Sequence, residues 1–102
     1  MATDLPPPTD DRVFVATRRQ VSCTVSDEVV ILHLDDGAYY GLNQVGTRVW
    51  ELLQEPRRLD EIVMAVVSEF DVSRSACEAD IRGLLKELGE RGLLEEPGPE
   101  VS

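Results

Sequence analysis

The spacing of apolar residues along this chain changes once, at Asn43. Before Asn43, apolar residues alternate with polar ones or form short β-branched runs, as is typical of strands. After Asn43, they recur at the spacing of amphipathic helices. Strands and helices therefore occupy separate halves of the chain, and we expect an α+β fold in which the helices cover one face of a sheet.

The first half predicts an antiparallel meander of three strands. Residues 21–26 alternate apolar with small hydroxylated side chains, as in an edge strand with one face in water. Residues 29–34 are apolar on both faces, and Asp35-Asp36-Gly37 then gives a strong hairpin signal before a third strand at 38–42. Residues 13–16 are expected to add a short extended segment.

The second half begins with two predicted helices. Asn43 is a favourable N-cap for the first, at about residues 44–54, and Pro56 ends it by removing a backbone donor. A second apolar stripe runs from Leu59 to Phe70 at helical spacing.

The third predicted helix is the longest. It begins at a capping serine, either Ser73 or Ser75, and its apolar stripe continues to Leu88. Gly89 and Gly92 supply the C-terminal stop, after which residues 93–94 return to the core. The expected architecture is a three-stranded antiparallel sheet followed by a three-helix bundle.

Length and charge limit the chain to one small acidic domain. Its 102 residues include 10 Lys plus Arg and 20 Asp plus Glu, a formal net charge of −10. Such a charge repels nucleic acids and anionic lipids and favours a cationic peptide or protein as partner. We expect a folded domain at residues 13–94, between a flexible N-terminal tail at 1–12 and a flexible C-terminal tail at 95–102.

The sequence carries no recognisable targeting or membrane segment. No run approaches the roughly 20 apolar residues of a membrane span, and the N-terminus lacks the basic and apolar regions of a signal peptide. We therefore expect a cytoplasmic protein that has no membrane partner. Cys23 and Cys77 fall far apart, in different predicted elements, and are expected to be reduced.

No pattern in the sequence points to catalysis. His33 is the only histidine, and it lies on a strand with two apolar faces and no accompanying serine or cysteine motif. The common zinc spacings are absent, and the paired carboxylates fall in the expected tails or in a turn. Gly37, Gly41 and Gly46 do not form a dinucleotide-binding motif. We expect no catalytic residue, no metal and no cofactor, and therefore no enzyme.

Tyr39 and Tyr40 allow two interpretations. In the simpler one, they are an ordinary strand pair with one ring in the core and one in water. In the other, they belong to a strand whose outer edge is open, because no lysine or proline protects it. Gly41 would also let another backbone approach that edge closely.

Several stretches of the expected domain occur in a recognisable order. They are Leu34 to Asn43 (LDDGAYYGLN), Gly46, Val49 to Leu53 (VWELL), Leu59 to Val63 (LDEIV), Asp80-Ile81, Leu84-Leu85, Leu88 and Gly92 to Leu94. Together they resemble the PqqD-like family, and most closely its stand-alone members encoded with lasso-peptide biosynthesis genes. The resemblance covers about residues 20–95.

This resemblance implies a winged-helix-like RiPP recognition element, where RiPP denotes a ribosomally synthesised and post-translationally modified peptide. Such modules are non-catalytic, and they bind the leader segment of a precursor peptide. The leader is typically added as a strand beside the third strand, with side chains in the groove against the third helix. Carried onto this sequence, the peptide-binding residues are Ala38, Tyr39, Tyr40, Gly41, Leu42, Cys77, Asp80, Ile81, Leu84, Leu85 and Leu88.

The resemblance also implies enzyme partners. A separate leader peptidase of the cysteine-protease type would receive the bound peptide, and a macrolactam cyclase would act after it. Many relatives have an acidic residue and a glycine in the turn after the first helix, whereas this chain has Gln54-Glu55-Pro56-Arg57. That departure concerns the assignment to a subfamily and leaves the groove unchanged.

A winged-helix DNA-binding regulator is the main alternative, because the three helices could contain a helix-turn-helix. The third helix has several basic residues, but acidic residues lie among them and cancel the charge. They are Arg74, Arg82, Lys86 and Arg91 against Glu78, Asp80, Glu87 and Glu90. A small hydrolase or redox protein ranks lower still, since the sequence has neither a nucleophile–base pair nor a CxxC motif.

Overall fold

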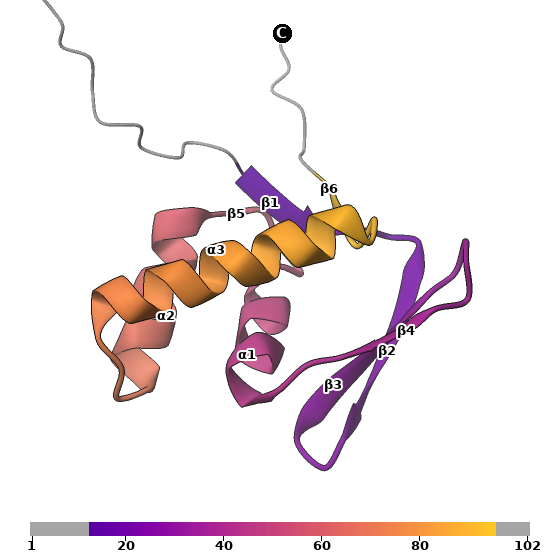
Figure 1. The fold of residues 1–102 in the computed structure, drawn as a ribbon. Coiled ribbons are helices and arrows are strands. Elements are labelled where there is room, and N and C mark those ends of the chain that lie inside the picture. The colour runs from indigo at the N-terminus through magenta and orange to yellow at the C-terminus, as the bar shows by residue number, and fades with distance from the viewer. Residues whose placement is uncertain (1–12, 96–102) are drawn as a thin grey trace, which may run out of the picture.

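The computed structural model describes residues 13–95 and confirms the α+β class. Both predicted tails lie outside these residues, apart from Glu95. Figure 1 shows a twisted sheet on one side of the molecule, α1 and α2 on the other, and α3 crossing toward the sheet. The strands are β1 (Val13–Ala16), β2 (Gln20–Val25), β3 (Glu28–His33), β4 (Tyr39–Gly41), β5 (Arg57–Arg58) and β6 (Leu94–Glu95); the helices are α1 (Gln44–Leu52), α2 (Leu59–Glu69) and α3 (Arg74–Glu90).

The predicted meander is present as the antiparallel sheet β2–β3–β4. Ser26 and Asp27 connect β2 to β3 with positive φ angles of 53° and 70°, the backbone required by a tight two-residue hairpin turn. Gly37, in the turn between β3 and β4, has φ 72°, a conformation that glycine adopts without steric cost. β4 pairs with β3 through Ile31 opposite Tyr40, and it forms one edge of this sheet.

A second small sheet, with the order β5–β1–β6, joins three distant parts of the chain. Val13 lies opposite Arg58, and Val15 lies opposite Glu95. The sequence predicted only an extended segment at 13–16, because β5 and β6 have two residues each and show no periodicity. The Glu95 carboxylate accepts hydrogen bonds from Thr17 Oγ1 at 2.9 Å and from the Arg18 N–H at 3.1 Å. These bonds tie the end of the domain to its beginning.

α1 and α3 begin at residues whose side chains cap them. Asn43 Oδ1 accepts a hydrogen bond from the Gly46 N–H at 2.8 Å at the start of α1, as predicted. For α3, Ser73 is the N-cap and its Oγ accepts from the Ala76 N–H at 3.3 Å, which decides between the two candidate serines. After α3, Gly92 reverses the chain with φ 74°.

The core lies between the inner face of the meander and the three helices. The largest side chains that are almost fully enclosed come from β3, all three helices and the segment after α3. Burial of these side chains fixes how α3 is rotated about its axis relative to β4, and so decides which of its residues remain accessible. They include Ile31, Leu53, Ile62, Ile81, Leu88 and Leu93.

Candidate functional site

Within residues 13–95, no strand pairs with the outer edge of β4. The His33 N–H donates to Ala38 O and the Leu42 N–H donates to Val29 O, both at 2.9 Å. In an antiparallel pair the direction of the backbone groups alternates along each strand, so those of Tyr40 also point to β3. The N–H and C=O groups of Tyr39 and Gly41 therefore point outward, where another strand could pair with them.

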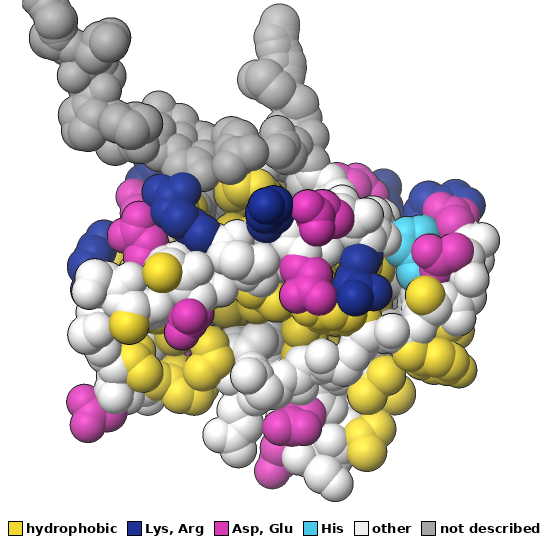
Figure 2. All heavy atoms as spheres, viewed as in Figure 1, with side chains coloured by type: hydrophobic (Ala, Val, Ile, Leu, Met, Phe, Trp, Pro, Cys, Tyr) yellow, Lys and Arg dark blue, Asp and Glu magenta, His cyan; other side chains and the backbone are white. Residues whose placement is uncertain are grey.

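A groove lies between this edge and α3. Tyr40 and Leu42 point to the helical side of the sheet, and Leu42 is buried whereas Tyr40 is half-buried. Leu84 on α3 is half-buried, and Asp80 is exposed one turn earlier. Figure 2 shows hydrophobic side chains in the hollow between α3 and the segment that joins β4 to α1, with charged side chains along the helix above them. The groove has an apolar floor and a charged rim.

One end of the groove is bridged by a cluster of three side chains. The guanidinium of Arg91 lies over the Tyr40 ring, 4.7 Å from its centroid, and Arg91 Nη2 donates to Glu87 Oε2 at 3.4 Å. Burial raises the pKa of the Tyr40 hydroxyl above its ordinary value, and a hydrogen bond with Glu87 raises it further. The cluster therefore joins β4 to the C-terminal end of α3.

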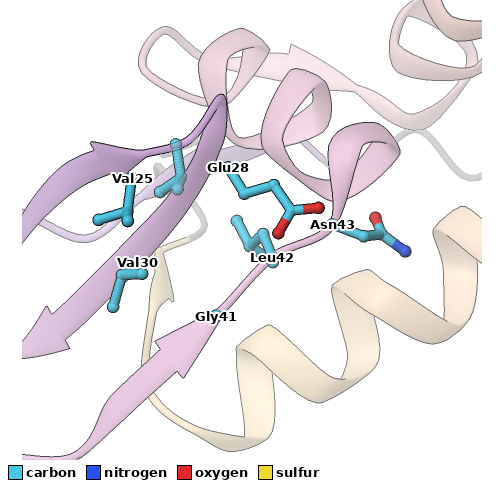
Figure 3. A pocket seen from close by; sticks show the side chains of 7 residues that line it. Val25, Glu28, Val30, Gly41, Leu42 and Asn43 are labelled. Atoms are coloured by element: carbon cyan, nitrogen blue, oxygen red, sulfur yellow. The ribbon is translucent and has the colours of Figure 1, made fainter.

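A second hollow, of about 320 Å³, lies beside Gly41, the last residue of β4. Figure 3 shows the Glu28 side chain extended past Leu42 toward Asn43, with Val25 and Val30 on the sheet nearby. A Cβ added at Gly41 would meet no atom within 4 Å, so the hollow is open above this residue. It is lined by Val25, Glu28, Val29, Val30, Gly41, Leu42 and Asn43.

The outer face of the meander is unusually apolar. Val21 and Val25 of β2 are 57% and 56% exposed, and Tyr39 of β4 is 71% exposed. The alternation in β2 leads one to expect its apolar side to be inside, but Ser22 faces the core side, where its Oγ accepts from Trp50 Nε1 at 3.4 Å. The helices do not extend far enough across the sheet to cover β2 fully, so both of its faces remain largely exposed.

His33 has a structural position. Its Nε2 lies 3.1 Å from Gly92 O, and its Nδ1 accepts from the Asp35 N–H at 3.1 Å, so both ring nitrogens are engaged by the backbone. Burial raises the pKa of the Cys77 thiol, which keeps it in the unreactive protonated form. Within residues 13–95, no three His, Cys, Asp or Glu side chains are grouped to hold a metal ion. No helix in the described part of the chain has the length and apolar character to cross a bilayer.

The model of the family described as coenzyme PQQ synthesis protein D (PqqD) matches residues 28–94, more than half of the 102 residues. The chain belongs to the PqqD family. This confirms the resemblance seen in the sequence. No match is found among curated proteins.

Two solved structures share the fold of this PqqD-family chain. One, "TbiB1 in Complex with the TbiA(beta) Leader Peptide", is 41% identical with a TM-score of 0.74, over 86% of this chain and 99% of that one. The other, "Lasso peptide synthetase B1 complexed with the leader peptide", is 23% identical with a TM-score of 0.71, over 80% of this chain and 96% of that one. At the lower identity, the likeness concerns the fold alone.

The residues predicted to bind a peptide differ in accessibility in this PqqD-family fold. Ala38, Tyr39, Gly41 and Asp80 are exposed, and Tyr40 and Leu84 are half-buried. The remaining ones are buried in the hydrophobic core, and one of them, Leu42, also lines the hollow beside Gly41. These buried residues are Leu42, Cys77, Ile81, Leu85 and Leu88.

Three residues near the β4 edge of this PqqD-family fold were not among those predicted from the sequence: Glu87 and Arg91 flank the groove, and Glu28 lines the hollow beside Gly41. Glu87 and Arg91 follow Leu84 by three and seven positions, so helical spacing places them on the same side of α3. That spacing is a signal that could have identified them. Glu28 gave no such signal, because its place beside Gly41 depends on the pairing of β3 with β4.

Proposed function

We propose that this PqqD-family chain is a RiPP recognition element that binds the leader segment of a precursor peptide by strand addition at β4. The observation that carries the proposal is the free backbone edge of β4 beside an apolar groove against α3. Strand addition draws affinity from main-chain hydrogen bonds and specificity from pockets for alternate side chains. The 41% identity to TbiB1, which was solved with a leader peptide, supports the same assignment.

The edge defines how a leader would bind. Its backbone would pair with the outward groups of Tyr39 and Gly41, and every second side chain would enter the groove over Tyr40 and Leu84. We estimate a binding free energy of about −8 to −10 kcal/mol. It combines two or three buried anchor side chains at about 1.5–3 kcal/mol each with the backbone hydrogen bonds, less the cost of ordering the leader. We therefore expect micromolar or somewhat tighter binding.

The chain is proposed to act without catalysis. His33 is the only histidine, and both of its ring nitrogens are within hydrogen-bonding distance of the backbone, which leaves no free imidazole base in the groove. Cys77 lies beneath the groove as a buried thiol with a raised pKa, unlike a catalytic cysteine, which is kept as a thiolate.

The bound leader is proposed to pass to a separate leader peptidase of the cysteine-protease type, with a macrolactam cyclase acting afterwards. The resemblance to lasso-peptide proteins implies these partners, and the exposed apolar face around Val21 and Val25 offers a surface for a protein contact. Val21→Asp, at an exposed residue of this face that does not line the hollow beside Gly41, should slow leader cleavage by the peptidase and leave leader affinity within about twofold. Unchanged cleavage by this variant would place the contact elsewhere.

DNA binding gains no support from α3. Arg82 pairs with Glu78 at 3.1 Å and Arg91 pairs with Glu87 at 3.4 Å, so two of its basic side chains are neutralised by acidic residues one turn away. A nucleic-acid interface needs basic side chains gathered on one face and free to contact phosphates.

The decisive experiment is a calorimetric titration with the leader peptide of the precursor encoded beside this protein's gene. We expect saturable binding with a negative heat-capacity change, because apolar surface is buried. A peptide of the same composition in scrambled order is the control. If the folded protein binds neither peptide, the proposal fails, and a gel-shift with duplex DNA at low salt would then test the alternative.

A further inference from the structure

The hollow beside Gly41 lies next to the place where an added strand would run. Cys23, Val30 and Gly41 pair across β2, β3 and β4 in one row. A strand added to β4 would place one of its residues next in this row. Side chains of one row lie on the same face of a sheet, about 4.5–5.5 Å apart at Cβ. That leader residue would therefore project from the outer face immediately beside Gly41.

Gly41 leaves room for that side chain to fold back across the sheet. No atom lies within 4 Å of a Cβ built at this position, and the hollow of about 320 Å³ opens there. A long unbranched side chain could lie over Gly41 and reach the valine methyl groups of Val30 and Val25. A short or β-branched side chain would leave most of the hollow empty.

The chemistry of the hollow is that of a site for a basic side chain. Val25 and Val30 supply apolar surface for methylene groups on one side of the hollow, and Glu28 supplies a carboxylate on the side of Leu42 and Asn43. Among residues 13–95, Glu28 forms no ion pair with a lysine or arginine, since the basic side chains that are paired there contact other carboxylates. Asn43 does not compete with Glu28 for a cation, because its amide is neutral and its Oδ1 accepts the N-cap hydrogen bond of α1.

We propose that this hollow binds a lysine or arginine side chain of the leader peptide, with Glu28 as its ion-pair partner and Gly41 as the opening. The inference depends on the proposed strand addition at β4 and adds to it a requirement on the leader's sequence. The net charge of −10 favours the same class of ligand at longer range. An apolar side chain of equal length would fill the hollow and partly desolvate an unpaired Glu28 carboxylate, which is unfavourable.

The test is a scan of the leader peptide encoded by the neighbouring precursor gene. Each leader residue in turn is made lysine and then norleucine, which has a similar length and no charge. Binding is measured to the native protein, to Glu28→Gln and to Asp27→Asn. The last variant is a matched control, because it removes one charge from the same hairpin at a residue that does not line the hollow.

We expect one position at which lysine binds the native protein about threefold to fivefold more tightly than norleucine, the range of a partly exposed ion pair. The preference should vanish in Glu28→Gln, persist in Asp27→Asn and weaken at high salt. Gly41→Val, which fills the opening, should reduce lysine binding at the same position. The stability of the Gly41→Val variant should change little, since the added side chain meets open space.

Two results would overturn the inference in distinguishable ways. If leader peptides bind but no position shows a lysine preference that depends on Glu28, the basic subsite is wrong and strand addition stands. If none of the peptides binds a folded protein, strand addition itself is wrong, and the subsite is wrong with it.

Discussion

The guanidinium of Arg91 lies 4.7 Å from the centroid of the Tyr40 ring and bridges α3 and β4 at one end of the groove. Cation–π attraction holds such a pair together, and Glu87 accepts a hydrogen bond from the same guanidinium. Gly41, the next residue of β4, lies beside a hollow on the opposite face of the sheet. The two faces of the β4 edge therefore differ in chemistry, and this difference would give a strand added there, as proposed above, a defined register.

The Tyr40 hydroxyl should ionise at a higher pH than a free tyrosine, because burial and then Glu87 raise its pKa. Since the unfolded chain ionises first, this group contributes its stability below about pH 10 and loses it as pH rises further. In Tyr39→Phe, Tyr40 is the only remaining tyrosine. Its tyrosinate absorbance should develop at higher pH in the folded protein than in denaturant. Coincident titration curves would contradict the burial of the hydroxyl.

Leu84→Asp should reduce leader affinity at least tenfold, because it places a carboxylate in the half-buried apolar part of the groove. Ala79→Asp adds the same charge at an exposed position of the same helix and should leave affinity nearly unchanged. Calorimetric titration measures the affinities, and thermal unfolding shows that both variants are folded. Equal affinities for the two variants would exclude this groove as the binding site.

Proline substitutions at Tyr39 and Tyr40 should affect different properties, leader binding for Tyr39→Pro and folding stability for Tyr40→Pro. Tyr40→Pro removes a backbone donor that points to β3, so we expect a loss of stability of about 1–3 kcal/mol, measured by urea unfolding. Tyr39→Pro removes a donor that points outward, which an edge strand tolerates, and should mainly weaken leader binding. A stable Tyr40→Pro variant that fails to bind would show that the direction of the strand's donors is the reverse.

Gly92→Ala should destabilise the protein by about 1 kcal/mol or more. Gly92 has φ 74°, and a Cβ there would lie 3.1 Å from His33 Nε2, so the substitution combines backbone strain with a close contact. Gly89→Ala is the control, since its Cβ would meet open space in α3 and alanine favours helix. In urea unfolding, Gly89→Ala should be at least as stable as the native protein. A Gly92→Ala variant as stable as the native protein would refute the expected strain at this residue.

The stability gained from Glu95 should be lost in acid. Hydrogen bonds from the Arg18 N–H and then from Thr17 lower the pKa of this carboxyl below its ordinary value. The charged form is therefore favoured in the folded state, and its contribution holds above the ordinary pKa and disappears as pH falls through the lowered one. Native protein should be more stable than Glu95→Gln at neutral pH, with the difference closing at acid pH. A difference that does not depend on pH would argue against these bonds.

Much of the fold was predictable because its signals are local. The period change at Asn43, the Asn43 cap and the Asp35-Asp36-Gly37 turn each depend on residues within a few positions of one another. For α3 the sequence left Ser73 and Ser75 as alternative caps, and the structure decided for Ser73. Local signals of this kind specify strands, helices and hairpins. They also located the β4 edge, since a meander with no further strand leaves its last strand unpaired. The family resemblance supplied the groove between that edge and α3.

What the tertiary structure decided depends on contacts between distant residues. The β5–β1–β6 sheet exists because Val13 meets Arg58 and Val15 meets Glu95, pairings that no periodicity encodes. The apolar side of β2 faces outward because Ser22 faces the core side, where its hydroxyl meets Trp50.

The rotation of α3 buries Leu85 and leaves Leu84 half-accessible, a difference of one residue that packing against the whole core determines. By itself, the sequence determined the meander, the three helices and which edge of the meander stays open. Only the packed structure decided which side chains line that edge, because side-chain accessibility is a property of all the neighbouring elements together.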